Sequence, residues 1–339
     1  MKIITIGINM NDMKKIGLTA LAGSLVAISA QAAEMTVSGA TLLTYTSEDS
    51  TEVTGNPLGM KTNLAFTASG EVNGYTVSYL QVSKDQFAGM SSARLSVDMG
   101  DMGTIAFDQG SGSGLATIDD KTPTAAEEIW DGLDDTTAGR VGAAGNTGVV
   151  NYVNTFSGVT LNAAFRKGSG TALADGASSA AGQSAYDFAL TTDGSSLGVD
   201  GLAMGVGYGE AQNGSETDTT YGDAEHMTAF ANYSVGPVTF GYQMSYIEAN
   251  VVGTDDQDID AWGLAFNVNE NLSLSYGERD VVYKGAGTSA DVTEKFDGIA
   301  VAYTMGSMKI AGNMNEVSDS AGVAGTNDSM TEIAVSFAF

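Results

Sequence analysis

The strongest constraint on the fold is an alternation of apolar with small or polar residues that recurs along most of the chain. In the last nine residues, one set of alternate positions holds Ile333, Val335, Phe337 and Phe339, and the other holds Glu332, Ala334, Ser336 and Ala338. Successive side chains of a β-strand point to opposite faces, so a period of two predicts a strand with one apolar and one polar face.

Sixteen segments carry this alternation. Most contain about 8–12 residues, the length that a tilted strand needs to cross the hydrocarbon layer of a membrane, whereas strands of soluble proteins average about 5–6 residues. The predicted strands are 34–46, 58–72, 75–84, 91–99, 103–109, 147–156, 159–167, 185–191, 202–209, 224–235, 238–248, 259–268, 272–283, 294–305, 308–317 and 328–339.

The connections between these segments alternate in length. Short turns such as Asn73-Gly74 and Ser157-Gly158, and one longer turn at 192–201, alternate with eight polar loops at 47–57, 85–90, 110–146, 168–184, 210–224, 249–258, 284–293 and 318–327. Short turns at one end and long loops at the other are typical of outer-membrane barrels. A soluble β-sandwich is the alternative, with its apolar faces turned into a core, but it gives no reason for this segregation. We therefore expect an all-β chain that forms one closed antiparallel barrel over 33–339.

The N-terminus has the pattern of an export signal. Met13-Lys14-Lys15 is a basic start, 16–28 is an apolar run, and Ala30-Gln31-Ala32 fits the small-x-small cleavage rule. The apolar run is shorter than the roughly 20 residues of a membrane-spanning helix. We expect a signal peptide at 1–32, with 1–12 as an upstream extension; a buried N-terminal helix is the alternative.

Charge and residue usage exclude several classes of function. The formal net charge is −27, and removal of 1–32 leaves 11 basic against 40 acidic residues, a net charge of −29. Such acidity argues against binding nucleic acid, whose phosphates would be repelled. The chain has no Cys, which excludes disulfides and thiolate chemistry, and a single His, His226. With no Gly-rich phosphate loop either, no catalytic function and no cofactor are expected.

Three features give the mature chain a family resemblance. They are the first strand at Glu34–Gly39, the terminal strand with Ile333, Val335, Phe337 and Phe339, and the strand Gly103–Asp108 that leads into a long acidic loop. With them the chain resembles the general diffusion porins of Gram-negative bacteria, especially the alphaproteobacterial kind. The resemblance implies a sixteen-stranded outer-membrane barrel, a homotrimer, and a C-terminal strand that the outer-membrane assembly machinery reads.

The same resemblance implies that the third outer loop, 110–146, folds into the lumen and narrows it. Its acids are Asp119, Asp120, Glu127, Glu128, Asp131, Asp134 and Asp135. Thr122 and Pro123 have the pattern of a helix start. Ile129, Trp130 and Leu133 are predicted to pack the loop against the wall while the acids face water. The alternative is a solvated outer loop whose acids only confer solubility.

Strand parity points five basic side chains toward the lumen: Lys61, Arg94, Arg166, Arg279 and Lys309. A positive wall facing an acidic loop would set up a transverse field at the narrowest point. The alternative is that each base makes a local ion pair of little consequence.

The predicted function is passive diffusion of small hydrophilic solutes and ions through a water-filled barrel. Net acidity indicates a preference for cations. Two alternatives remain: a substrate-selective outer-membrane channel, and a plugged barrel that acts as a structural anchor or adhesin. The acidic runs Asp119-Asp120, Asp134-Asp135 and 255–258 have oxygen ligands that suit Ca²⁺, although none matches a calcium-loop motif.

Overall fold

The computed structural model describes residues 34–48, 57–83, 90–133, 139–145, 147–168, 184–212, 222–249, 256–285 and 289–339. The predicted signal peptide lies outside these residues. Sixteen strands account for most of them: β1 Glu34–Glu48, β2 Leu58–Val72, β3 Tyr75–Ser83, β4 Met90–Asp98, β5 Thr104–Gln109, β6 Thr147–Phe156, β7 Val159–Arg166, β8 Ala185–Thr192, β9 Leu202–Ala211, β10 Ala224–Val235, β11 Val238–Glu248, β12 Gln257–Asn267, β13 Leu272–Tyr283, β14 Val292–Met305, β15 Met308–Ser318 and β16 Asp328–Ala338.

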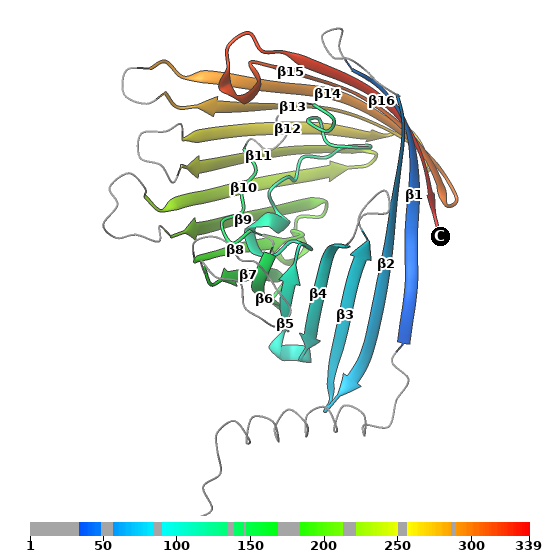
Figure 1. Cartoon of the computed structure of the whole chain (residues 1–339), viewed down its shortest axis with the longest axis vertical. Coiled ribbons are helices and arrows are strands. Elements are labelled where there is room, and N and C mark those ends of the chain that lie inside the picture. Colours follow the sequence, from blue (N-terminus) through cyan, green and yellow to red (C-terminus); the bar gives the residue numbers. More distant parts are fainter. Residues whose placement is uncertain are drawn as a thin grey trace, which may run out of the picture.

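The strands form one closed antiparallel barrel, as the alternation predicts. Each strand pairs with its neighbours in the sequence, and β1 pairs with β16 to close the ring. At the seam, the amide and carbonyl groups of Gly39 and Phe339 bond each other at 2.8 and 2.9 Å. Figure 1 shows the strands in sequence order around the ring, with the C-terminus beside β1. Closure leaves no strand edge exposed.

The two faces of the wall differ in polarity, and β16 illustrates the rule. Ile333 is 53% exposed on the outer face, while its neighbour Ala334 is 4% exposed on the inner face. The other strands follow the same alternation, which places large apolar side chains such as Phe107, Phe240 and Ile299 outside. The outer surface of this barrel therefore carries many large apolar side chains, where the outside of a soluble protein would be polar.

The short turns all lie at one end of the barrel, and the strand ends joined by the longer connections lie at the other, the long-loop end. Asn73-Gly74 and Ser157-Gly158 have positive φ at both central residues, 53° and 85° and 50° and 83°. These angles belong to the tight hairpin turn whose twist matches the flanking strands. Glycine suits the second position because a side chain is strained there.

No end of a predicted strand differs from the observed end by more than two residues. The largest differences include β12 and β14, which begin two residues earlier than expected. The predicted helix start at Thr122–Pro123 is wrong: no helix begins there, and the nearest helical turn is the 3₁₀-helix η2 at Gly114–Thr117. No helix among the described residues is long and apolar enough to cross a membrane.

Candidate pore constriction

The segment that joins β5 to β6 runs along the inner face of the wall, where side chains of successive strands bind its backbone. Near its start, the Gly114 amide donates to Asn162 Oδ1 on β7 at 2.9 Å. Lys121 donates its amide to Gln243 Oε1 on β11 at 2.7 Å. In Figure 1 this cyan-to-green segment lies inside the curve of the strands.

Further along, the outgoing limb reaches the far strands of the barrel. The Ala125 amide donates to Ser275 Oγ on β13 at 2.9 Å. The side-chain amide of Asn315, on β15, donates to the carbonyls of Glu128 and Asp131 at 3.1 and 2.9 Å. These bonds follow the strand order β7, β11, β13, β15, so the outgoing limb covers about half of the inner wall. They replace the internal bonds of the predicted helix, which accounts for its absence.

The return limb, 139–145, lies against strands that the outgoing limb has already crossed. Gly139 donates its amide to Gln257 Oε1 on β12 at 2.9 Å, and Gly142 donates to His226 Nδ1 on β10 at 3.4 Å. Ala144 donates to Asp187 Oδ2 on β8 at 2.8 Å. Asp187 Oδ1 accepts the Leu115 amide of the outgoing limb at 3.0 Å, so one buried carboxylate binds both limbs.

Sequence reasoning missed Asp187 and the fully buried Asp108. Asp108 accepts the Ser113 hydroxyl at 2.8 Å and lies 3.5 Å from Arg94 Nε. Both are acids at inward positions of predicted strands, where small or uncharged residues are the rule in this chain. An acid at such an inward position is the sequence signal that could have identified both residues as loop contacts.

Apolar contacts complete the attachment of the loop. Ile129, Trp130 and Leu133 are buried in one cluster with wall residues of β12–β16, including Ile259, Phe296 and Met330. Earlier in the segment, Leu115 and Ile118 form a second cluster with residues of β8 and β10. The packing is as the sequence predicts, and it makes the segment part of the barrel's interior.

The predicted acids fall into three groups. Glu127 and Asp131 are exposed, Asp119, Asp120 and Glu128 are half-buried, and Asp134 and Asp135 lie outside the described residues. The expectation that all of them face water is therefore wrong for the half-buried three, which the wall partly covers.

Burial changes the acidity of the half-buried group. It raises the pKa of Asp119 to about 6, helped by the neighbouring Asp120 charge, and it raises the pKa of Asp120 as well. For Glu128, burial and then the Asp120 and Glu127 charges raise the pKa to about 7. Desolvation penalises the charged form of a carboxyl group, so these three acids titrate nearer to neutral pH than free carboxyl groups do.

Three of the predicted lumen bases contact the loop. Arg94 donates from Nη2 to the Gly112 carbonyl at 2.7 Å and to Ser113 Oγ at 2.9 Å. Arg166 lies so close to Gly145 that a Cβ there would come within 2.9 Å of Nη1. Arg279 is only 3% exposed, with its guanidinium carbon 4.5 Å from the centre of the Trp130 ring.

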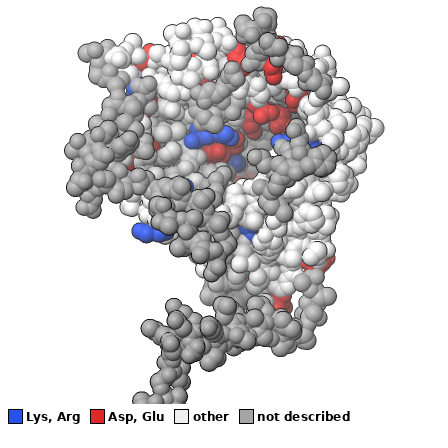
Figure 2. All heavy atoms as spheres, viewed as in Figure 1, with Lys and Arg blue, Asp and Glu red and all other residues white. Residues whose placement is uncertain are grey.

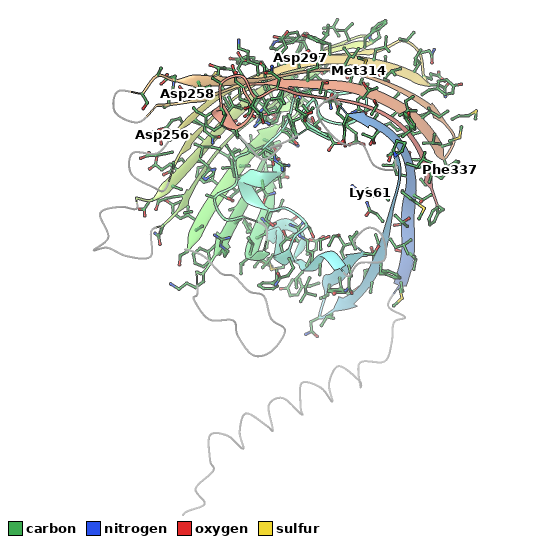
Figure 3. All side chains as sticks on the ribbon, turned by 45° about the horizontal axis from the view of Figure 1, so that its top comes forward. Lys61, Asp256, Asp258, Asp297, Met314 and Phe337 are labelled. Atoms are coloured by element: carbon green, nitrogen blue, oxygen red, sulfur yellow. The ribbon has the colours of Figure 1, made fainter. Side chains whose placement is uncertain are left out.

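The other two predicted bases lie away from the loop contacts. Lys61 is exposed on β2 and extends into the open space of the ring (Figure 3). Lys309 pairs with Thr304 and Ser336 near the short-turn end, about 20 Å along β15 from Asn315 at ~3.3 Å per residue. Lys121 and Arg140, which the sequence reasoning left out, are basic residues within the acidic segment itself.

On β4, Arg94 bonds Gly112 and Ser113 at the start of the loop. Figure 3 shows open space inside the ring beside β1 and β2, into which Lys61 extends. Glu332 on β16 borders this space; it accepts the Thr46 hydroxyl at 3.1 Å and lies within electrostatic range of Glu127, Asp131 and Lys61. Figure 2 shows basic and acidic side chains gathered in the hollowed centre of the molecule. Together these side chains give the space inside the barrel a local electrostatic field.

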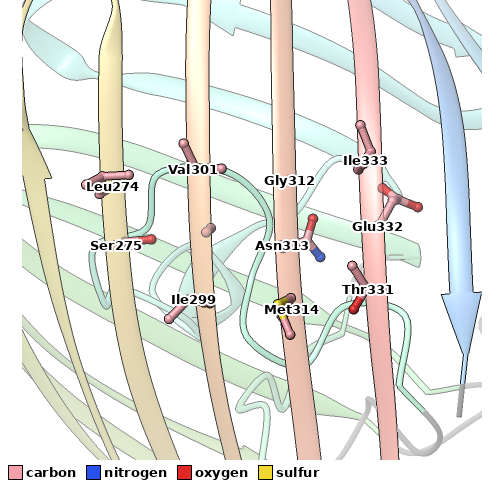
Figure 4. Close-up of a pocket in the computed structure, with 11 residues that line it drawn as sticks. Leu274, Ser275, Ile299, Val301, Gly312, Asn313, Met314, Thr331, Glu332 and Ile333 are labelled. Carbon is pink, nitrogen blue, oxygen red and sulfur yellow. The ribbon is translucent and has the colours of Figure 1, made fainter.

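The outer surface of the wall is also hollowed, across β13–β16. A groove of about 420 Å³ crosses β13–β16 and is lined by outward apolar side chains such as Leu274, Val301 and Ile333, with Gly312 between them (Figure 4). The predicted assembly residues Ile333, Val335 and Phe337 share this outer face, and Phe339 is 68% exposed at the chain end.

Calcium has no preformed site in the part of the chain that the structure describes, where no three acidic or histidine side chains converge as metal ligands would. Asp134, Asp135 and Asp255 lie outside that part. Asp258 instead lies 2.6 Å from Lys284 Nζ. Calcium binding by the acidic runs stays a prediction.

No protein-family model matches the sequence, and no curated protein matches it. Solved structures match its fold. The trimer form of OmpT, an outer membrane protein of Vibrio cholerae, matches with a TM-score of 0.67 at 15% identity, over 91% of this chain and 100% of that chain. An anion-selective porin from Comamonas acidovorans matches with a TM-score of 0.63 at 12% identity, over 91% and 100%. A triple mutant of the Rhodopseudomonas blastica porin matches with a TM-score of 0.56 at 14% identity, over 90% and 100%. The chain therefore has the fold of sixteen-stranded outer-membrane porins.

Proposed function

We propose that this protein is an outer-membrane porin that lets small hydrophilic solutes and ions diffuse through its barrel. The observation that carries the proposal is the inverted polarity of a closed wall. Large apolar side chains such as Phe107 and Phe240 are exposed outside, while the inside is lined by polar residues and an acidic loop. A barrel with this polarity suits lipid outside and water inside, and sixteen to eighteen strands leave room for an aqueous channel.

The loop that joins β5 and β6 narrows the channel from one side. Its bonds to Asn162, Gln243 and Asn315 hold it against half of the wall and leave the space beside β1–β4 for solutes. The passage is bordered by Glu127, Asp131 and Glu332, and by Lys61 within electrostatic range of Glu332. With acids in the majority, cations pass more readily than anions.

Several parts of this proposal rest on sequence pattern and family resemblance. Residues 1–32 direct export and are removed, the terminal strand with Ile333, Val335, Phe337 and Phe339 is read during outer-membrane assembly, and three copies associate. The protein performs no catalysis and needs no cofactor. The Comamonas porin shares the fold and is anion-selective, so the cation preference proposed here rests on the charges of this chain and not on its fold.

Solute uptake into liposomes tests the proposal. Purified mature protein reconstituted into vesicles should let small neutral sugars enter at rates that fall steeply with sugar size. Vesicles made with the same amount of heat-unfolded protein provide the control. Uptake restricted to one compound would favour the substrate-selective channel, and no uptake of any solute would favour a plugged barrel.

A further inference from the structure

Besides Asp187 on β8, Arg279 marks a second place where both limbs of the loop meet the wall. It is on β13, directly across from Phe296 on β14 and Ala261 on β12. The side chain is 3% exposed, although it carries a full charge. A buried charge needs compensation from its surroundings, and such a residue usually has a specific role.

The guanidinium group is held between aromatic rings of the loop and of the wall. Its central carbon lies 4.5 Å from the centre of the Trp130 ring on the outgoing limb, and 6.0 Å from that of Phe296 on β14. Arginine stacks on aromatic faces through its planar, weakly hydrated group, and the attraction strengthens where water is excluded. The stack thereby links the loop to the wall.

The return limb meets the same group from another side. Gly139 comes so near that a Cβ at this position would collide with Arg279 Nη2. The Gly139 amide donates to Gln257 on β12, and this hydrogen bond holds the return limb close to Arg279. Asp119 and Asp120 line the same small cavity as Arg279 and Trp130, and supply negative charge.

We propose that Arg279 is a positioning residue that fixes both limbs of the loop relative to the wall, and that permeating ions do not meet its charge directly. The planar group, and not the charge alone, makes the contact with Trp130. Replacement by lysine keeps the charge but removes the plane, so it should release the limb. Release of the limb should also make the ionic current through the open channel fluctuate more, a consequence that rests on the proposed function.

The chain provides an internal reporter for this contact, because it has only two tryptophans. Trp262 lies on β12, where its indole donates to Glu278 Oε2 at 3.2 Å. Trp262→Phe leaves Trp130, which is 5% exposed, as the sole tryptophan. Quenching of its fluorescence by iodide or acrylamide then measures how tightly the outgoing limb is held.

In the Trp262→Phe background, we expect Arg279→Lys and Arg279→Gln to raise the acrylamide quenching constant of Trp130 several-fold, with an unchanged far-ultraviolet circular dichroism spectrum. Lys309→Gln, which removes a wall charge remote from the loop contacts, should leave quenching at the parental level. Parental quenching in both Arg279 variants would overturn the proposal. If neither variant folds, Arg279→Met, which fills the buried site without the planar group, decides: increased quenching supports the positioning role, and parental quenching contradicts it.

Bilayer recordings on the same proteins separate this inference from the proposed function. Several-fold larger open-channel current noise in Arg279→Lys than in the parent is expected. If no protein conducts, including the parent, yet quenching rises as expected, the positioning role stands and the channel function fails. If the parent conducts and Trp130 stays protected in the variants, the positioning role fails alone.

Discussion

Glu128 and Asp119 give the loop a charge that changes near neutral pH. Burial raises the pKa of Glu128 to about 7 and that of Asp119 to about 6. A carboxyl group is charged above its pKa, so both acids are ionised at pH 8 and protonated at pH 5. We therefore predict that the cation preference of the channel falls as the pH is lowered from 8 to 5.

The reversal potential across a salt gradient, recorded at several pH values, measures this effect. Glu128→Gln should flatten the upper part of the curve, around pH 7. Glu127→Gln, at the exposed neighbour, should lower the cation preference at high pH and move the fall to lower pH, because the Glu127 charge contributes to the raised pKa of Glu128. A wild-type preference that does not change between pH 8 and 5 would contradict the assigned environment of these acids.

Asp187 is the residue whose loss should loosen the loop most at its base. Its two oxygens accept the Leu115 and Ala144 amides, and Asp187→Ala leaves both buried donors without this partner. An unsatisfied buried donor costs about 1–3 kcal/mol. We predict a fall of that order per donor in the free energy of unfolding by urea, and no change for Asp200→Ala in an exposed turn. Equal midpoints for the two variants would exclude the anchoring role.

At the scale of elements, the strands could be predicted and the course of the loop could not. A strand repeats its pattern every two residues, so Phe240, Tyr242 and Met244 identify β11 locally. The loop is positioned by partners far away in the sequence. Nothing around Lys121 signals that its amide binds Gln243, 122 residues later. The local helix signal at Thr122 and Pro123 was overridden by such contacts.

The apolar packing of the loop could be predicted, because its signal lies within the loop sequence itself. Large apolar residues inside an acidic segment indicate that this part of the segment is buried against other apolar groups. Ile129, Trp130 and Leu133 are such residues. By contrast, the parity argument placed Arg279 on the inner face but gave no sign that the loop would bury it. Strand parity predicts the face to which a side chain points, whereas its burial depends on which other segment packs over that face.

The loop fits its wall because glycines make room for it. At Gly263, a Cβ would lie 2.9 Å from the Pro123 carbonyl oxygen, so Gly263→Ala should displace the loop and change the single-channel conductance measurably. Gly312→Ala is the matched control, because its Cβ would face outward with no atom nearer than 3.6 Å. Identical conductance in both variants and the wild type would argue against a seat for the loop at Gly263.

At the scale of the whole molecule, the outer surface has two different sides. Within the described strand residues, the outward positions of β16 and β1–β8 carry no charge. The outward positions of β9–β15 carry acids near the long-loop end: Glu210, Glu225, Glu248, Asp258, Asp260, Glu278, Asp280, Asp297 and Glu316. The uncharged side is the better surface for association between copies, since charged residues are depleted at interface cores.

Two leucines test which side associates. Leu43 on β1 is 48% exposed and Leu264 on β12 is 41% exposed, both on the outer face. An arginine facing lipid costs about 2–4 kcal/mol at the membrane midplane. The two substitutions should therefore lower the stability of the barrel by similar amounts. We predict that Leu43→Arg converts trimers to monomers and that Leu264→Arg stays trimeric, as measured by native mass spectrometry. The reverse result would move the interface to the acidic side.

If the protein is a porin, its closed wall surrounds a continuous water path with an acidic margin. Single-channel recording in planar bilayers, with a salt gradient across the membrane, tests it most directly. We expect discrete current steps, a current proportional to voltage at low voltage, and a reversal potential of the sign for cations. Correctly folded barrels that insert into the bilayer and carry no current would contradict it.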